Sequence, residues 1–165
     1  MKKILISVLV TFVVMTFATS CGGKKEAKVD NSLEELKARG EFVLGLDDSF
    51  PPLGFRDDNN NIVGYDIDLA SEVCKRLGVT LRCQPIDWAA KEQELNTGNI
   101  DCIWNGFTMT PERKEALSFT EAYLDNAQVV IVRGDSGYKT LADLAGKTVG
   151  LQAGSSAADA LYASD

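Results

Sequence analysis

The sequence predicts an α/β fold in which strands and helices alternate around a mostly parallel sheet. Short apolar segments have the length of strands, and between them apolar residues recur at helical spacing. The expected strands are residues 42–46, 79–83 and 100–104, and the expected helices are residues 66–77 and 88–97. Gly78 and Gly98 stand where these two helices end. Alternation of this kind favours parallel strands joined by crossover helices.

The remaining elements follow from turn and cap signals. Asp58 and the three Asn residues after it predict a turn, and the strand that follows predicts a hairpin. Thr110 and Pro111 have the order of a helix cap and a first helical residue. Beyond this helix we expect strands at residues 128–132 and 147–151, a short helix at 140–144 and the opening of a helix at 156–162.

The composition excludes several classes of function. The chain of 165 residues has a formal net charge of -7, which argues against nucleic acid as a partner because phosphate binding needs a basic surface. The sequence has no His, and so lacks the commonest metal ligand and the commonest general base. We therefore expect no metal and no cofactor. The length suggests one domain, or one domain and part of a second.

The first twenty residues have the pattern of an export signal, with Lys2 and Lys3 ahead of an apolar stretch too short to cross a bilayer comfortably. The small residues before Cys21 resemble the lipobox of a bacterial lipoprotein, in which this Cys becomes the lipidated first residue, although Ala18 stands where Leu is commoner. An ordinary cleaved signal is the alternative. The polar residues 21–31 are then expected to form a tether.

Three further cysteines are Cys74, Cys83 and Cys102. An odd number cannot all pair within the chain. Cys74 has apolar neighbours at helical spacing and Cys83 at strand spacing, so we interpret the three as small buried hydrophobic residues, and their spacing does not indicate a zinc site.

Three expected loops follow the carboxyl ends of strands, at residues 47–55, 86–88 and 105–110. In a parallel sheet they open on the same side, which is where ligands bind in such folds. A backbone N–H at Gly106, the Thr108 hydroxyl and the Arg113 guanidinium are candidates to meet one anion, because Arg offers a carboxylate two parallel hydrogen bonds. The alternative is a surface Arg113 paired with Glu112 or Glu115.

Four stretches in order resemble the bacterial extracellular solute-binding proteins of family 3, which serve polar amino acid ABC importers. They are Phe50-Pro51-Pro52-Leu53-Gly54-Phe55, Gly64-Tyr65-Asp66-Ile67-Asp68-Leu69, Thr108 to Arg113 with Phe119, and Leu141-Ala142-Asp143-Leu144-Ala145-Gly146-Lys147. The resemblance extends from about Leu33 to the end of the chain. Asp66 and Asp68 lie at a helix start and are interpreted as structural rather than ligand-binding.

The resemblance implies a binding site for an amino acid. Its α-carboxylate would be held by Gly106, Thr108 and Arg113, helped by Ser155 or Ser156 at a helix N-terminus, which favours anions. Phe50 and Trp88 would sandwich the ligand, and Asp47 would face its polar side chain or ammonium group. The alternatives are core packing for the two aromatic residues and a turn cap with Asp48 or Ser49 for Asp47. Which amino acid binds stays open.

The resemblance also implies the architecture and setting of the protein. The fold would be like that of the type II periplasmic binding proteins, with signal peptide 1–20, tether 21–31, first lobe 32–126 and the start of a second lobe at 127–165. Family members are longer, so the chain is expected to be a fragment with an incomplete second lobe.

The implied protein is extracytoplasmic, is anchored to the membrane through Cys21, closes by a hinge on its ligand and docks on importer permease subunits. We expect a binding protein rather than an enzyme. The rivals are a periplasmic dehydratase-like enzyme on the same scaffold, with Asp47 as its acid or base, and the sensing domain of a signalling protein.

Overall fold

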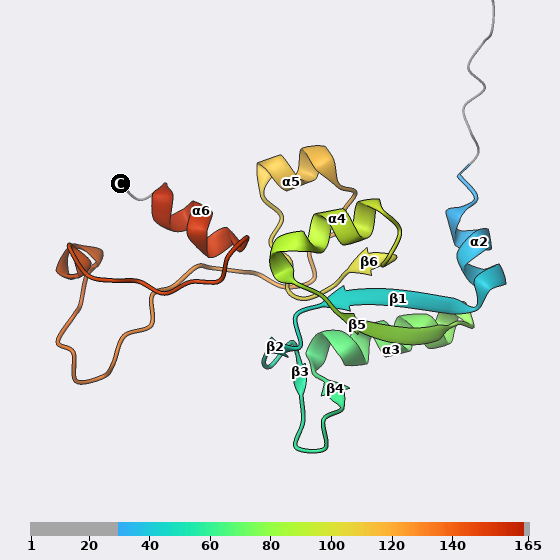
Figure 1. Cartoon of the computed structure of the whole chain (residues 1–165), viewed down its shortest axis with the longest axis horizontal. Helices are drawn as coiled ribbons and strands as arrows, with labels where there is room; N and C mark the ends of the chain where they lie inside the picture. Colours follow the sequence, from blue (N-terminus) through green and yellow to red (C-terminus); the bar gives the residue numbers. More distant parts are fainter. Residues whose placement is uncertain (1–29, 164–165) are drawn as a thin grey trace, which may run out of the picture. The chain divides into compact units, whose positions relative to one another are not determined.

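The computed structural model describes residues 30–163 of the chain (Figure 1). The predicted signal peptide, Cys21 and most of the predicted tether lie outside these residues. The elements are α2 (Ser32–Arg39), β1 (Glu41–Leu46), β2 (Ser49–Phe50), β3 (Gly54–Arg56), β4 (Ile62–Val63), α3 (Tyr65–Leu77), β5 (Thr80–Pro85), η1 (Trp88–Ala90), α4 (Lys91–Asn96), β6 (Cys102–Ile103), α5 (Pro111–Ala116), η2 (Leu141–Leu144) and α6 (Ser156–Tyr162). No helix among residues 30–163 combines the length and the apolar character that a membrane crossing needs.

The main sheet is parallel, as the alternation of strands and helices predicts. Strand β1 lies in the centre, with β5 on one side and β6 on the other. Parallel strands need crossover connections: the one from β1 to β5 contains α3, and the one from β5 to β6, on the other side of β1, contains η1 and α4. The carboxyl ends of the three strands therefore meet at one edge, where the loops after Leu46, Pro85 and Ile103 begin.

The predicted hairpin is confirmed and is part of a second, antiparallel sheet in the order β2-β3-β4. Its tight turn is organised by Asp57, whose carboxylate accepts the N–H groups of Asn59 at 2.9 Å and Asn61 at 2.8 Å. A side chain that binds the backbone two residues further on is typical of Asp in turns. This hairpin leads directly into α3 and so fixes the start of that helix.

The hydrophobic core lies where α3 packs against the parallel sheet. Leu44, Leu46, Ile67 and Ala70 are buried together there. In Figure 1, α3 lies on one side of the ribbon formed by β1 and β5, and α4 lies on the other. Covering both faces explains why β1 is apolar along most of its length rather than alternating with polar residues.

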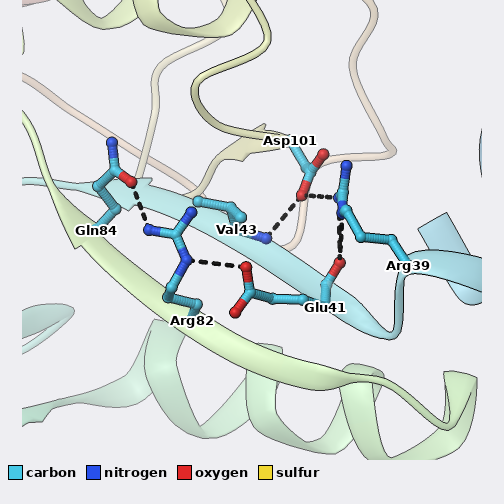
Figure 2. Close-up of polar contacts among 6 residues, drawn as sticks. All are labelled: Arg39, Glu41, Val43, Arg82, Gln84 and Asp101. Carbon is cyan, nitrogen blue, oxygen red and sulfur yellow. Dashed lines mark hydrogen bonds and ion pairs between the residues drawn. The ribbon is translucent and has the colours of Figure 1, made fainter.

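A polar network joins the strands at the N-terminal end of β1 (Figure 2). Arg39 donates to the carbonyl oxygen of Glu41 and pairs with Asp101, while the Asp101 carboxylate also accepts the N–H of Val43 at 2.7 Å. Arg82 of β5 donates to the Glu41 carboxylate at 3.0 Å. These contacts fix the relative positions of β1, β5 and the loop before β6 at the edge opposite the loops that follow Leu46, Pro85 and Ile103.

The predictions of strands at residues 128–132 and 147–151 are wrong. Both segments are irregular, and among residues 30–163 neither one is paired in a sheet. A strand depends on backbone hydrogen bonds to a neighbour and on burial of one face. Here Val129 is 75% exposed and Ile131 is 91% exposed. The apolar side chains that predicted a strand therefore stay exposed instead of forming a buried strand face.

Other differences concern element ends. The helix predicted over residues 88–97 divides into the 3-10 turn η1 and the short helix α4. The strand predicted at 100–104 shortens to β6, whereas β5 runs two residues further than expected, to Pro85. The helix predicted at 156–162 is confirmed as α6, and η2 occupies the short helix predicted at 140–144 apart from its first residue.

Candidate ligand-binding site

The candidate site begins at the sheet edge where β1 and β6 end. The side chain of Asn105, which is buried, accepts the backbone N–H of Asp47. This bond joins the loop after β1 to the loop after β6, as the parallel order of the sheet requires. Two loops that carry predicted ligand contacts are therefore held side by side by a bond between the Asn105 side chain and the Asp47 backbone.

Arg113 lies at this edge and is only 9% exposed. The Thr110 hydroxyl accepts the N–H of Arg113 at 3.3 Å and so caps α5. The guanidinium donates to the carbonyl oxygens of Thr108 at 3.0 Å and Gly154 at 3.2 Å, and it lies 4.4 Å from the ring centre of Phe107. The alternative of a solvent-exposed Arg113 is therefore wrong.

The acidic residue nearest to the guanidinium is neither Glu112 nor Glu115, the two partners considered from the sequence. Arg113 Nε lies 3.9 Å from a carboxylate oxygen of Glu92 on α4. At that distance the contact is a loose ion pair rather than a hydrogen bond. A guanidinium has five N–H donors in a planar fork, and the two carbonyl contacts use only part of this capacity.

Thr108 is the centre of a group of hydroxyl and amide side chains. Its hydroxyl accepts hydrogen bonds from Ser156 at 3.1 Å and from the Asn126 amide at 2.6 Å. The Gln128 amide donates to the Ser156 hydroxyl at 3.0 Å. Ser155, by contrast, donates its hydroxyl to the carbonyl oxygen of Gln152 at 2.8 Å. Of the two predicted serines, Ser156 is the one whose side chain lies beside Thr108.

Gly106 differs from expectation because its N–H already has protein acceptors. It donates to Asp66 at 2.8 Å and to the Tyr123 hydroxyl at 3.2 Å, while that hydroxyl donates to the other Asp66 oxygen at 2.9 Å. The Gly106 backbone has φ +57°, and a Cβ there would lie 2.5 Å from Leu53 Cδ1. Gly106 therefore shapes the loop, and its N–H is engaged by Asp66 rather than directed at an anion beside Arg113.

Asp66 is buried in this group, and its environment opposes ionisation. Burial raises the pKa of the Asp66 carboxyl, while the hydrogen bonds from Tyr123 and Gly106 act in the opposite direction. Burial and the adjacent Asp66 raise the pKa of the Tyr123 hydroxyl well above its usual range. These contacts join the start of α3 to residue 123, which lies 57 residues further along the chain.

The predicted aromatic walls have different environments. Trp88 is half-buried and meets Phe107 edge to face at 5.7 Å between ring centres, and Phe107 stacks on Phe119 at 5.6 Å. Phe50 is 45% exposed, which excludes simple core packing for its ring. It lies next to Gly106, where a Cβ would be 3.7 Å from its Cε1 atom. The structure therefore places Trp88 in an aromatic cluster and Phe50 at the surface of the loop.

Asp47 makes the turn cap with Ser49 that was the alternative to a ligand contact, and it also makes a contact with a distant side-chain amide. One carboxylate oxygen accepts the N–H of Ser49 at 2.8 Å, which is the turn cap. The other accepts the Gln152 side-chain amide at 2.6 Å, from a segment 105 residues further along the chain. Asp47 therefore contacts the distant segment around Gln152 as well as its own turn.

Sequence reasoning missed Lys91, the first residue of α4. Its side chain is buried, and its ammonium donates to the carbonyl oxygens of Gly154 at 3.0 Å and Trp88 at 3.2 Å. Burial, followed by the charge of Arg113, lowers the pKa of this ammonium. A signal existed in the helical spacing, since Lys91 lies three residues after Trp88 and four before Leu95, on the apolar side. Because Lys side chains are normally exposed to solvent, this spacing alone did not lead us to expect a buried Lys.

Among residues 30–163 the structure holds no group of three or more His, Cys, Asp or Glu side chains arranged for a metal ion. Cys74, Cys83 and Cys102 are free thiols, of which Cys74 is buried and the other two are half-buried. Burial raises the pKa of Cys102 to about 11. The three thiols are accordingly protonated near neutral pH.

The arrangement so far places a buried guanidinium and a group of hydroxyls at the carboxyl edge of a parallel sheet, and the comparisons with known proteins assign the chain to a family. The family model described as bacterial extracellular solute-binding proteins, family 3, matches residues 42–157. The chain belongs to this family.

Two curated relatives illustrate the range of ligands in the family. The chain is 33% identical over 156 residues to the arginine-binding extracellular protein ArtP of Bacillus subtilis, covering 94% of this chain and 57% of that protein. It is 31% identical over 144 residues to the L-cystine-binding protein TcyJ of Escherichia coli, covering 86% of this chain and 54% of that protein. The chain thus spans about half the length of these relatives.

Solved structures give the same family. An ABC uptake transporter substrate binding protein from Streptococcus pneumoniae with bound histidine superposes with a TM-score of 0.78 and 41% identity, covering 82% of this chain and 55% of that one. A mutant of ArgBP from T. maritima gives a TM-score of 0.75 and 42% identity, covering 80% and 58%. The predicted fold class is confirmed: an α/β fold like that of the two-lobed type II periplasmic binding proteins, with most of the first lobe and part of the second.

Proposed function

We propose that this chain is the ligand-capturing part of a protein that binds an amino acid outside the cell, with Arg113 holding the ligand α-carboxylate. The single observation that supports this most is a buried guanidinium at the carboxyl edge of a parallel sheet, bonded to the backbone of Thr108, whose hydroxyl in turn bonds that of Ser156. Relatives named for binding arginine, histidine and cystine share the amino acid backbone as their common ligand feature.

The chemistry of the proposed clamp follows from charge and geometry. A carboxylate accepts two parallel hydrogen bonds from a guanidinium fork, and hydroxyl groups donate to its remaining lone pairs. Thr108 and Ser156 supply hydroxyls that lie 3.1 Å apart, and the N–H groups of Arg113 that are not bonded to carbonyls supply the fork. We assign Gly106 to shaping this loop, and Ser155 to supporting the turn that precedes Ser156.

The rest of the ligand is proposed to contact Phe50, Trp88 and Asp47. The exposed ring of Phe50 provides an apolar surface, and Trp88 provides a second one backed by Phe107. The Asp47 carboxylate, which accepts one N–H and one amide, retains lone pairs for a ligand ammonium or a polar side chain. This set suits a polar amino acid.

We propose a first lobe at residues 32–126 and a second lobe that begins at residue 127, joined by a hinge that closes on the ligand. Three contacts between these two stretches support closure: Asp47 with Gln152, Thr108 with Ser156, and Arg113 with Gly154. All three involve residues proposed to bind the ligand. A ligand that touches both stretches shifts the equilibrium toward the closed form by its preference for that form.

We further propose an export signal at residues 1–20, a lipid anchor at Cys21 with a tether to residue 31, and docking of the closed form on the permease subunits of an ABC importer. The sequence pattern supports the anchor, and the family description as extracellular supports export. No catalytic role is proposed, because the relatives above are named as binding proteins.

Calorimetric titration of the purified protein tests the proposal. We expect binding of L-arginine, L-histidine or L-cystine, and loss of that binding in Arg113→Ala, because removing one partner of a buried charge pair costs about 3 to 5 kcal/mol, more than a hundredfold in affinity. Arg76→Ala, on the exposed face of α3, is the matched control and should bind as the wild type does. Unchanged affinity in Arg113→Ala would refute the assignment.

A further inference from the structure

Lys91 is a buried cation that the proposed carboxylate clamp does not yet use. The residue is 4% exposed, and its ammonium donates to two backbone carbonyls, those of Trp88 and Gly154. The ammonium also lies 5.4 Å from the ring centre of Trp88 and 5.8 Å from that of Phe107. A buried ammonium is costly unless it is hydrogen-bonded, so its position has to be maintained by these partners.

The Gly154 carbonyl is the acceptor that Lys91 shares with Arg113. The two cations donate to it at 3.0 Å and 3.2 Å respectively. Gly154 has φ +68°, and a Cβ at this position would lie 3.1 Å from the Cα of Ala89 and 3.6 Å from the Lys91 ammonium. The turn that contains Gly154 therefore packs directly against the backbone of η1, with no room for a side chain between them.

Positive charge exceeds buried negative charge around the Gly154 carbonyl. The Glu92 carboxylate lies 3.9 Å from both Lys91 and Arg113, but its side chain is 46% exposed and it makes only loose ion pairs. Asp159 on α6 also favours the charged form of Lys91. Two buried cations that meet at one carbonyl oxygen create a positive potential, which is strongest where water is excluded. An anionic group placed between them would relieve their mutual repulsion.

We infer that Lys91 is a positioning residue of the amino-acid site, which with Arg113 fixes the turn at residues 152–155 against the first lobe and adds a second positive charge at the carboxylate end. This inference rests on the proposed function and deepens it. The first statement is that Lys91 holds this turn in position without ligand. The second statement is that Lys91 adds to the positive charge that the ligand carboxylate meets.

Hydrogen exchange of the full chain without ligand tests the first statement. Lys91→Met keeps the length of the side chain but removes the donor, and Gly154→Ala opens the same contact without changing any charge. Both variants should exchange amide hydrogens about tenfold faster or more at residues 152–162, with β1 unaffected, because a hydrogen bond to a charged group is lost or strained. Lys37→Met, at an exposed position on α2, is the charge-matched control. Wild-type exchange in Lys91→Met would overturn the inference.

Titration of free acids and their amides tests the second statement. The probes are L-arginine with L-argininamide, and L-histidine with L-histidinamide. Lys91→Met should weaken binding of the free acid about tenfold more than binding of the amide, because only the acid carries the carboxylate. An equal loss for both would overturn the charge assignment. If the wild type bound neither acid, the proposed function would fail for these ligands, while the exchange experiment would still decide the position of the turn.

Discussion

The hydroxyl of Tyr123 offers a sharp test of how the site loop is held. Replacing it in Tyr123→Phe removes the 2.9 Å hydrogen bond to Asp66 and keeps the ring that contacts Tyr65 and Trp104. A hydrogen bond to a charged group contributes about 1.5–3 kcal/mol. Asp66 is fully buried but Tyr123 is 41% exposed, so we take the lower end, about 1.5 kcal/mol, which is about a tenfold decrease in the folding equilibrium constant.

Urea unfolding near neutral pH measures this change. Tyr162→Phe is the matched control, because Tyr162 is 76% exposed and lies on α6. The slope of the unfolding free energy against urea should stay the same in both variants, since neither changes the surface exposed on unfolding appreciably. If Tyr123→Phe were as stable as Tyr162→Phe, the reasoning that Asp66 anchors the loop through Tyr123 and Gly106 would be refuted.

Two further predictions concern the same group of residues. Gly106→Ala should lose about 2 kcal/mol of stability in thermal unfolding, because φ +57° is strained for Ala and its Cβ would approach Leu53 closely; wild-type stability would contradict this. Burial raises the folded-state pKa of Asp66, so its favourable contribution is complete below its unfolded pKa of about 3.9 and is lost as the pH rises through the folded value. The unfolding free energy of the wild type minus that of Asp66→Asn should therefore fall between pH 4 and pH 7, and an increase would show that the hydrogen bonds outweigh burial.

The sequence predicted the fold where local patterns and burial agree. The strand at residues 42–46 is apolar, is bounded by Gly40 and Asp47, and is buried between two helical layers, so pattern and environment coincide. Residues 128–132 have an equally good pattern, but a strand also needs a partner, and a pattern cannot supply one.

The site was predictable to a similar degree. Arg113 and Thr108 follow from a strand end and a capped helix, both of which are local signals. The engagement of the Gly106 N–H by Asp66 depends on a contact across 40 residues, which no local pattern indicates. Lys91 was hidden because its residue type suggests solvent, whereas its spacing places it on the apolar side of its helix. Contacts between distant segments decide which polar groups remain available to a ligand.

The central claim is that Arg113 recognises the carboxylate of an amino acid, and a double-mutant cycle between protein and ligand tests it most directly. Wild type and Arg113→Ala are titrated with L-arginine and L-argininamide, and with L-histidine and L-histidinamide as a second pair. We predict that the wild type prefers the free acid by about a hundredfold or more, and that Arg113→Ala binds acid and amide with nearly equal affinity. A variant that retains the full preference for the free acid would contradict the account.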